Sequence, residues 1–416
     1  MARLSIFLLT LLCGLGFWRA ATAADAEPAD TDWAHANETE FSVVPFVGGS
    51  SDVGFGGGYI ASLAQLRPNH DPYLYRIDTS GSVTFRKARD GAMRVPYADL
   101  FLRWKFPHLI RNQLGLELRA SYTRETNLGY YGLGNAARLP DGLERGDPFF
   151  EHSRVHPTLR AMLEYHPRPF VLSWGFSYTE NWLEVPEGTL LANDLGSERA
   201  YVSELLGNAR PHGVPKFSFG AGWDTRDDEV APVRGWNITE QLDLVPGTLG
   251  EARHRFARWN NAVHVYVPLI AQQRRLVFAL RVGSDLLFGN APLDELPRFD
   301  ESFALGGSKG VRGIPAQRYY GKIKLLANAE LRSELISLRL LGVERRLGLV
   351  AFADTGRLWA DYTAHPDLDG SSLGLKYGFG GGLRIASGKT FMLRFDLAWS
   401  PEGGGPSGYL LAGHMF

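Results

Sequence analysis

Two stretches near the end of the sequence decide the fold class: LGLKYGFGGGLRI at residues 373–385 and FMLRFDLAWS at residues 391–400. In both, apolar residues alternate with small or charged ones, and side chains on a β-strand point alternately to its two faces. Each stretch therefore predicts a strand with one face of Leu, Phe and Trp and another of Gly, Arg, Asp and Lys. Strands of about 10 residues with this contrast are typical of a β-barrel with lipid outside and water inside.

The same alternation, punctuated by turn residues, extends along most of the chain and predicts about 16 strands. They are expected near residues 41–48, 53–66, 73–86, 94–106, 113–125, 152–165, 169–180, 215–225, 234–245, 254–268, 274–288, 321–335, 345–359, 373–386, 389–400 and 407–416. An even number of antiparallel strands suits a closed outer-membrane barrel in which every backbone group is paired. The predicted fold class is all-β: a transmembrane antiparallel β-barrel formed by residues 41–416.

The start of the sequence predicts export from the cytoplasm. Residues 1–23 read as a secretory signal peptide, with Arg3, an apolar stretch at 4–18 and small residues at 21–23. A lipoprotein signal around Cys13 is the weaker alternative, because a large residue precedes this cysteine. Residues 24–40 carry six carboxylates and no Lys or Arg, which predicts a disordered periplasmic tail.

The bulk composition fits a membrane barrel. Mean hydropathy is −0.15, a value typical of soluble proteins, but lipid-facing and lumen-facing residues average out in a barrel. The chain has 48 Gly, 24 Phe, 16 Tyr and 10 Trp, and aromatic rings favour the membrane–water interface. A net charge of −1 argues against nucleic acid as a partner. Cys13 is the one cysteine, so no disulfide or Cys-based metal site is expected after the signal peptide.

Two motifs distinguish this sequence from a generic barrel. They are WDTRDD at residues 223–228, followed by Pro232, Arg234 and Gly235, and GGSKGVRG at residues 306–313. Both resemble hallmarks of the bacterial surface antigen superfamily, which comprises BamA-type barrel-assembly proteins, TamA-type translocation proteins and two-partner secretion transporters. The resemblance covers nearly all of residues 41–416. The motif positions are Asp224, Arg226, Asp227, Pro232 and Gly235 in the first, and Gly306, Gly307, Val311 and Gly313 in the second.

The resemblance implies that the second motif lies on a loop folded into the barrel between the eleventh and twelfth strands. Its arginine, Arg312, is then expected to pair with carboxylates of the inner wall, and Glu330 and Asp354 stand at the matching positions. A planar guanidinium suits carboxylate partners, and a well-bonded buried pair fixes the position of a loop. The alternative is that Arg312 is a solvated loop residue and the two carboxylates are ordinary polar groups of the lumen.

Two features depart from the family pattern. Ile314 stands where the family has an aromatic residue after Val-Arg-Gly, so any ring packing made by that residue is missing. The POTRA repeats that usually receive client chains are not expected before the first strand. This second departure puts client delivery by this chain alone in doubt.

The sequence does not predict catalysis or a cofactor. The acidic residues at 224 and 227–229 are either a calcium site or a polar turn, and their spacing, which matches no named calcium loop, favours the turn. No metal is therefore expected. None of the 11 His residues lies in a metal or triad pattern, and no Gly-x-Ser-x-Gly elbow occurs. The enzymatic alternative left open is a lipase with a Ser–His pair on the lipid-facing rim.

These features together predict a protein of the bacterial outer membrane. Phe416 resembles the terminal aromatic signal that delivers barrels to the assembly machinery. The leading hypothesis, by resemblance, is insertion or translocation of polypeptides through a weak seam between the first and last strands, with the lipid bilayer and unfolded outer-membrane or secreted polypeptides as partners. One alternative is a passive channel or structural barrel. Another is a secretion or lipid-handling role with a separate periplasmic partner, reached through the acidic tail.

Overall fold

The computed structural model describes most of the chain after the predicted amino-terminal tail. The described residues are 38–50, 53–67, 70–87, 91–110, 114–139, 142–143, 146–167, 169–228, 231–250, 253–270, 276–299, 304–340, 343–387 and 391–416. The predicted signal peptide, residues 1–23, and residues 24–37 of the predicted acidic tail lie outside them. Residues 38–40, which we expected in the tail, belong to the first strand.

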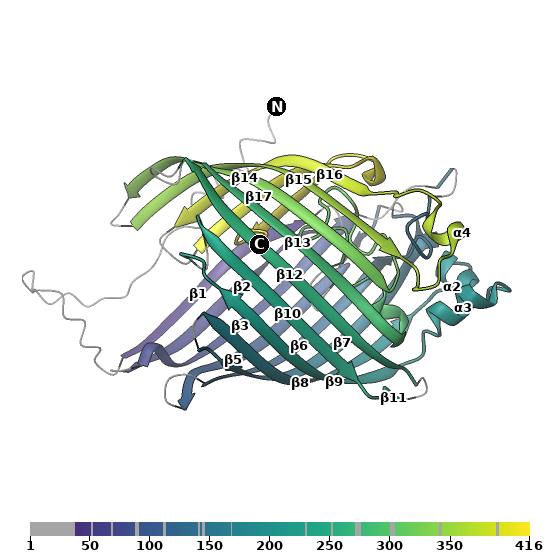
Figure 1. Cartoon of the computed structure of the whole chain (residues 1–416), viewed down its shortest axis with the longest axis horizontal. Coiled ribbons are helices and arrows are strands. Elements are labelled where there is room, and N and C mark those ends of the chain that lie inside the picture. The colour runs from purple at the N-terminus through teal and green to yellow at the C-terminus, as the bar shows by residue number, and fades with distance from the viewer. Residues whose placement is uncertain are drawn as a thin grey trace, which may run out of the picture.

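A single antiparallel sheet of 18 strands closes on itself into a barrel (Figure 1). Two of these strands are only two residues long, β4 (Met93–Arg94) and β11 (Leu249–Gly250). The others are β1 (Glu38–Ser50), β2 (Gly54–Arg67), β3 (His70–Lys87), β5 (Tyr97–Ile110), β6 (Leu114–Gly129), β7 (Glu151–Tyr165), β8 (Phe170–Glu184), β9 (His212–Asp224), β10 (Gly235–Val245), β12 (Arg255–Ile270), β13 (Leu276–Asn290), β14 (Ile323–Leu340), β15 (Val343–Trp359), β16 (Lys376–Ser387), β17 (Phe391–Trp399) and β18 (Ser407–Ala412). The predicted antiparallel barrel is confirmed, and each long strand overlaps one predicted range.

The two faces of the sheet have the predicted chemistry. On β17, Phe395, Leu397 and Trp399 are exposed on the outer face, whereas Arg394 and Asp396 are buried on the inner face. A strand with this contrast is stable only where its outer face meets lipid and its inner face meets water or polar protein groups. No helix among the described residues is long and apolar enough to cross a membrane.

The connections carry short helices that alternation cannot predict. These are η1 (Pro148–Phe150), α2 (Leu190–Leu195), α3 (Ala200–Leu206), η3 (Leu293–Glu295), α4 (Pro366–Asp369) and η4 (Pro401–Gly403). Figure 1 shows α2, α3 and α4 together at one end of the barrel, while β1 (purple) starts at the opposite end. We call the end with the helices the capped end and the other the mouth.

A separate apolar core lies at the capped end. Leu191 and Leu206 of α2 and α3 are buried against Leu293 of η3, together with Tyr130 and Tyr320 from the adjoining loops. Burial of this apolar surface stabilises the connections where no strand pairing holds them. The described parts of the segment between β13 and β14, residues 291–299 and 304–322, take part in this core and lie along the inner wall.

Candidate functional site

Arg312, on the segment between β13 and β14, is fully buried against the polar face of the neighbouring strands. Its Nε and Nη2 donate to the two carboxylate oxygens of Asp354 on β15, at 2.7 and 2.9 Å. Its Nη1 donates to Oε1 of Glu330 on β14 at 2.7 Å. The structure therefore brings together the three residues that the sequence singled out, with the two-pronged geometry that favours a guanidinium–carboxylate pair.

Asp396, a third carboxylate, was missed by the sequence analysis. Its Oδ2 lies 3.2 Å from Arg312 Nη1, and the Arg312 guanidinium also covers the Phe352 ring at 3.4 Å from the ring centre. Asp396 lies on the buried face of β17, as its place in the alternation requires. Nothing local in the sequence distinguishes it from other inner-face carboxylates. We call Arg312, Glu330, Asp354 and Asp396 the Arg312 cluster.

Two further arginines balance the charge of these carboxylates. Arg332 Nε donates to Glu330 Oε2 at 2.8 Å, and Arg384 Nη1 donates to Asp396 Oδ1 at 2.5 Å. Each of these carboxylates thus bridges two guanidinium groups. Removing charges from water is costly unless each is paired and hydrogen-bonded, so the cluster is stable as a network rather than as separate pairs.

The glycines of the second motif allow the loop backbone to approach the wall. Gly313 has φ +92, and a Cβ there would lie 2.8 Å from the carbonyl carbon of Trp399. On the wall itself, a Cβ at Gly378 of β16 would lie 1.9 Å from the Arg312 carbonyl oxygen. Both positions therefore require glycine, since any side chain would push the loop away from the strands.

The remaining residues of the second motif shape the loop around Arg312. Gly306 and Val311 form an isolated bridge, and Gly307 has φ +87. Val311 and Ile314 are fully buried in one apolar cluster, which also contains Phe299, Leu305, Tyr319, Leu326 and Leu358. Ile314, at the position of the family's aromatic residue, thus fills this cluster with an aliphatic side chain.

Between the long strands, and for the residues described, the seam between β1 and β18 is the least paired junction of the barrel. Among the described residues, only Gly49 and Ser50 of β1 are in register with β18, opposite Leu410 and Tyr409. By contrast, β1 pairs with β2 along its whole length, from Glu38 to Ser50. The Tyr409 hydroxyl accepts a hydrogen bond from the Gly313 backbone N–H at 3.0 Å. The loop that carries Arg312 is therefore bonded directly to the strand at the seam.

The first motif forms a turn at the mouth, between β9 and β10. Arg226 pairs with Asp224 at 2.7 Å, and Asp227 Oδ1 accepts from the backbone N–H groups of residues 233 and 234 at 2.9 and 3.2 Å. Gly235 has φ +111, and Pro232 lines a nearby pocket. These contacts support the turn interpretation. Glu229 lies outside the described residues, among which no group of three or more acidic, His or Cys side chains is placed to hold a metal.

Phe416 does not lie on the last strand, so the prediction of a strand at 407–416 is wrong at its end. β18 ends at Ala412, and Gly413 has φ +81, which turns the chain away from the strand direction. The Phe416 carbonyl oxygen accepts from Arg332 Nη2 at 2.8 Å. Arg281 on β13 lies 5.2 Å from the centre of the Phe416 ring, so the end of the sequence lies against the inner faces of β13 and β14.

A second charged cluster, also missed from sequence, ties the cap to the barrel wall. Asp294 of η3 lies 2.9 Å from Arg154 Nη2 and 3.1 Å from His212 Nε2. Burial alone would raise the pKa of the Asp294 carboxyl, but Arg154 and His212 outweigh this effect and hold its pKa well below the usual range. Asp294 is therefore a carboxylate at neutral pH and bonds η3 to β7 and β9.

Comparisons with known proteins identify the same fold. A family model described as the Omp85 superfamily domain matches residues 170–406. No curated protein sequence matches. The structure of BamA from Haemophilus ducreyi lacking POTRA domains 1–3 has a TM-score of 0.58 at 16% identity, covering 91% of this chain and 70% of that chain. CdiB from Escherichia coli has a TM-score of 0.56 at 15% identity, covering 92% of this chain and 64% of that chain.

The present chain thus spans less than two thirds of the CdiB chain and somewhat more of the BamA chain. At these identities the two structures show a shared barrel fold. The family model adds a sequence match that extends over more than half of the chain and includes both motifs. This chain belongs to the Omp85 superfamily, and it is a β-barrel of the bacterial outer membrane.

Proposed function

We propose that this barrel inserts or translocates polypeptides at the outer membrane, and that the β1–β18 seam is where it engages them. The observation that carries the proposal is the pairing at this seam, which, in the part of the chain that the structure describes, involves only Gly49 and Ser50 of β1. Over the rest of β1, the described residues of β18 supply no partner. An open strand edge offers N–H and C=O groups to which an extended chain can add as a further strand.

The Arg312 cluster supports a closed resting state of this seam. The Gly313–Tyr409 hydrogen bond holds β18 to the loop, and Asp396 holds the same loop to β17. We infer that the loop fixes the position of the last two strands while β1 remains free along most of its outer edge. Opening then requires β1 to separate from only a short stretch of β18.

A disulfide across the seam tests the proposal. If the Gly49–Leu410 register continued by two residues, Val47 would lie opposite Ala412. The test variant is therefore Val47→Cys with Ala412→Cys, whose disulfide closes the seam beyond the stretch that is paired. No cysteine follows Cys13 in the sequence, so the new pair has no competing thiol after the signal peptide. With this variant as the only copy in the cell, oxidation should deplete specific barrels or secreted proteins from the outer-membrane and secreted proteomes, and reduction should restore them.

The matched control places the same staple between β1 and β2. Val43 and Ala61 are in register there, so Val43→Cys with Ala61→Cys adds a disulfide to the barrel without closing the seam. This control should leave both proteomes unchanged. Undiminished delivery of clients by the fully oxidised seam variant would rule out the seam as the route.

A further inference from the structure

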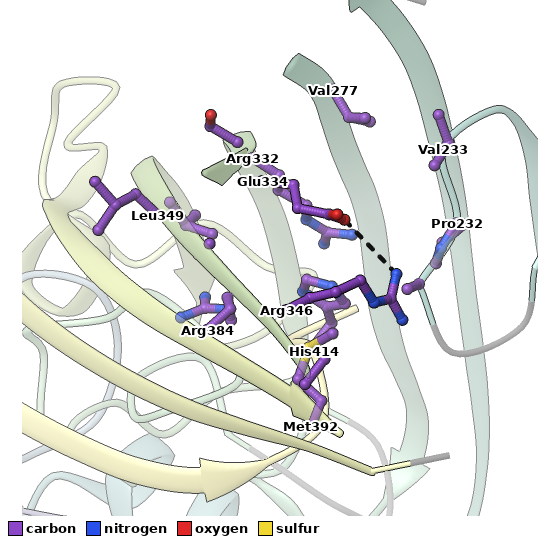
Figure 2. A pocket seen from close by; sticks show the side chains of 15 residues that line it. Pro232, Val233, Val277, Arg332, Glu334, Arg346, Leu349, Arg384, Met392 and His414 are labelled. Atoms are coloured by element: carbon purple, nitrogen blue, oxygen red, sulfur yellow. Dashed lines mark ion pairs between the residues drawn. The ribbon is translucent and has the colours of Figure 1, made fainter. Parts of the chain in front are cut away.

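An arginine-lined pocket lies on the inner wall at the mouth (Figure 2). It has a cavity of about 70 Å³, lined by side chains from β13 to β17, by the turn before β10 and by residue 414. We call it the mouth pocket and define it by its polar residues, which are Arg332, Glu334, Arg346, Arg384 and His414. Figure 2 shows the Arg346 side chain extending across the cavity toward Pro232.

Several nitrogen atoms around the mouth pocket have no hydrogen-bond acceptor. Among the described residues, no acceptor lies within reach of Arg332 Nη1, Arg346 Nε, or Arg384 Nε and Nη2, all of which are buried. Arg332 and Arg384 are only 7% and 4% exposed. A buried donor without an acceptor costs about 1–3 kcal/mol, and more when it is charged. The pocket is therefore built with donors that an anion would satisfy.

The carboxylates nearby are already used. Glu330 accepts from Arg312 and Arg332 through its two oxygens, and Asp396 accepts from Arg384. The one carboxylate inside the pocket, Glu334, lies 3.7 Å from Arg346 Nη1, which is too long for a hydrogen bond. Donors therefore exceed acceptors in the mouth pocket.

The position of the pocket indicates where its ligand comes from. Glu334 lies near the end of β14 and Arg346 near the start of β15. Because neighbouring strands are antiparallel, both residues lie at the same end of the barrel as the start of β1. The arginines project from the inner face of the sheet, away from the lipid-facing side. Val277 and Met392 form apolar walls beside them. A ligand that enters from the aqueous mouth and carries both a carboxylate and apolar carbon fits this lining.

We propose that the mouth pocket binds a carboxylate of an acidic peptide segment. A guanidinium presents a planar fork of donors that matches a carboxylate. Arg346 and Arg384 each turn such a group toward the cavity, and Arg332 adds its Nη1, because its Nε and Nη2 already donate to Glu330 and Phe416. This inference deepens the proposed function and rests on it, because it names an acidic polypeptide as what the barrel engages at its mouth. Glu334 is an internal competitor, since its carboxylate is next to Arg346.

Peptide binding to the full-length protein in detergent micelles tests the inference. The probe is a fluorescein-labelled peptide of alternating Glu and Ala, and its neutral counterpart has Gln in place of Glu. Fluorescence anisotropy at low salt should show the acidic peptide binding at least about tenfold more tightly than the neutral one. Arg346→Gln should lower the affinity for the acidic peptide by about tenfold. Glu334→Gln should raise this affinity several-fold because it removes the internal competitor.

The matched control is Arg103→Gln on β5, which removes the same charge from a guanidinium already bonded to Asp78 at 2.8 Å. It should leave binding within about twofold. Equal weakening by Arg103→Gln and Arg346→Gln would overturn the site, since it would reflect net charge alone. Displacement of the peptide by phosphatidylglycerol added to the micelles, but not by the same amount of a neutral phospholipid, would overturn it in favour of a lipid headgroup. Heat-modifiable migration in gels verifies that each variant is folded.

This experiment is independent of the seam experiment. The binding assay contains no insertion step, so a functional seam together with absent peptide binding overturns only the mouth pocket. Specific peptide binding together with an undiminished stapled seam overturns only the proposed function.

Discussion

Arg312 is a buried cation that meets more carboxylate than one guanidinium can neutralise. Glu330 and Asp396 each accept from a second arginine, which restores the balance of charge. Asp354 has the closest match, because both its oxygens accept from Arg312. At the scale of single residues, the geometry of this fork therefore matters as much as the charge.

Arg312→Lys should test that distinction. Lysine keeps the positive charge but cannot bond Asp354 with two parallel N–H groups while also reaching Glu330. We expect a loss of roughly 1–3 kcal/mol in the free energy of unfolding, the cost of leaving buried acceptors of Asp354 and Glu330 without their donors. Urea unfolding in detergent micelles, followed by tryptophan fluorescence, measures it, together with proteolysis of the loop in the folded protein.

Arg103→Lys is the control, because Arg103 pairs with Asp78 while its own side chain is 30% exposed. A partly exposed pair contributes less than about 1 kcal/mol, so this change should be nearly neutral. If both lysine variants unfold at the same urea concentration, the Arg312 cluster does not hold the loop.

The sequence predicted part of this cluster and missed the rest for a physical reason. Arg312, Glu330 and Asp354 were found because the motif and strand positions resemble a family pattern. Asp396 and Arg384 alternate like any other inner-face residues, and Asp396 meets Arg312 across 84 positions of sequence. Contacts of this kind depend on the register of whole strands and on the path of a loop, neither of which alternation specifies.

At the scale of elements, alternation predicts strands well and their ends poorly. All the long strands overlap predicted ranges because each has an apolar outer face that lipid requires. The two-residue strands β4 and β11 are too short to alternate. The end of β18 depends on the backbone at Gly413, and α2 and α3 are held by burial of Leu191 and Leu206 in the cap core, so neither feature has a periodic signature.

The cap should depend on pH through Asp294 of η3. Because its folded-state pKa lies below the ordinary value of about 4, the Asp294 carboxylate stabilises the fold above about pH 4. This contribution is lost as the pH falls toward the lower folded-state value. The difference in unfolding free energy between the wild type and Asp294→Asn should therefore be on the order of 2 kcal/mol at pH 7 and shrink toward zero as the pH is lowered below 4.

The control for the cap is Asp361→Asn, which removes a partly exposed ion pair with Lys322. It should cost less than about 1 kcal/mol at pH 7. A difference between the wild type and Asp294→Asn that stays constant from pH 7 down to pH 3 would contradict the assignment of an ionised Asp294 in the cap.

At the scale of the whole molecule, one segment connects the capped end of the barrel to the seam. Residues 291–322 begin in the cap with Asp294, pass along the inner wall with Arg312, and bond β18 through Gly313. The segment also occupies part of the lumen side of β13 to β17, where its side chains are buried. Because this segment covers part of the inner wall, the barrel should conduct a smaller ion current than an open passive pore.

Planar-bilayer conductance should therefore separate the proposed function from a passive channel. With the loop held by the Arg312 cluster, the wild-type barrel should show a low and intermittent current. Arg312→Glu places a carboxylate among three others, and their repulsion should release the loop and raise both the conductance and the fraction of time open. The Arg103→Lys variant should behave as the wild type. A large, steady current through the wild-type protein that Arg312→Glu leaves unchanged would favour the passive channel, because the loop would then not restrict the lumen.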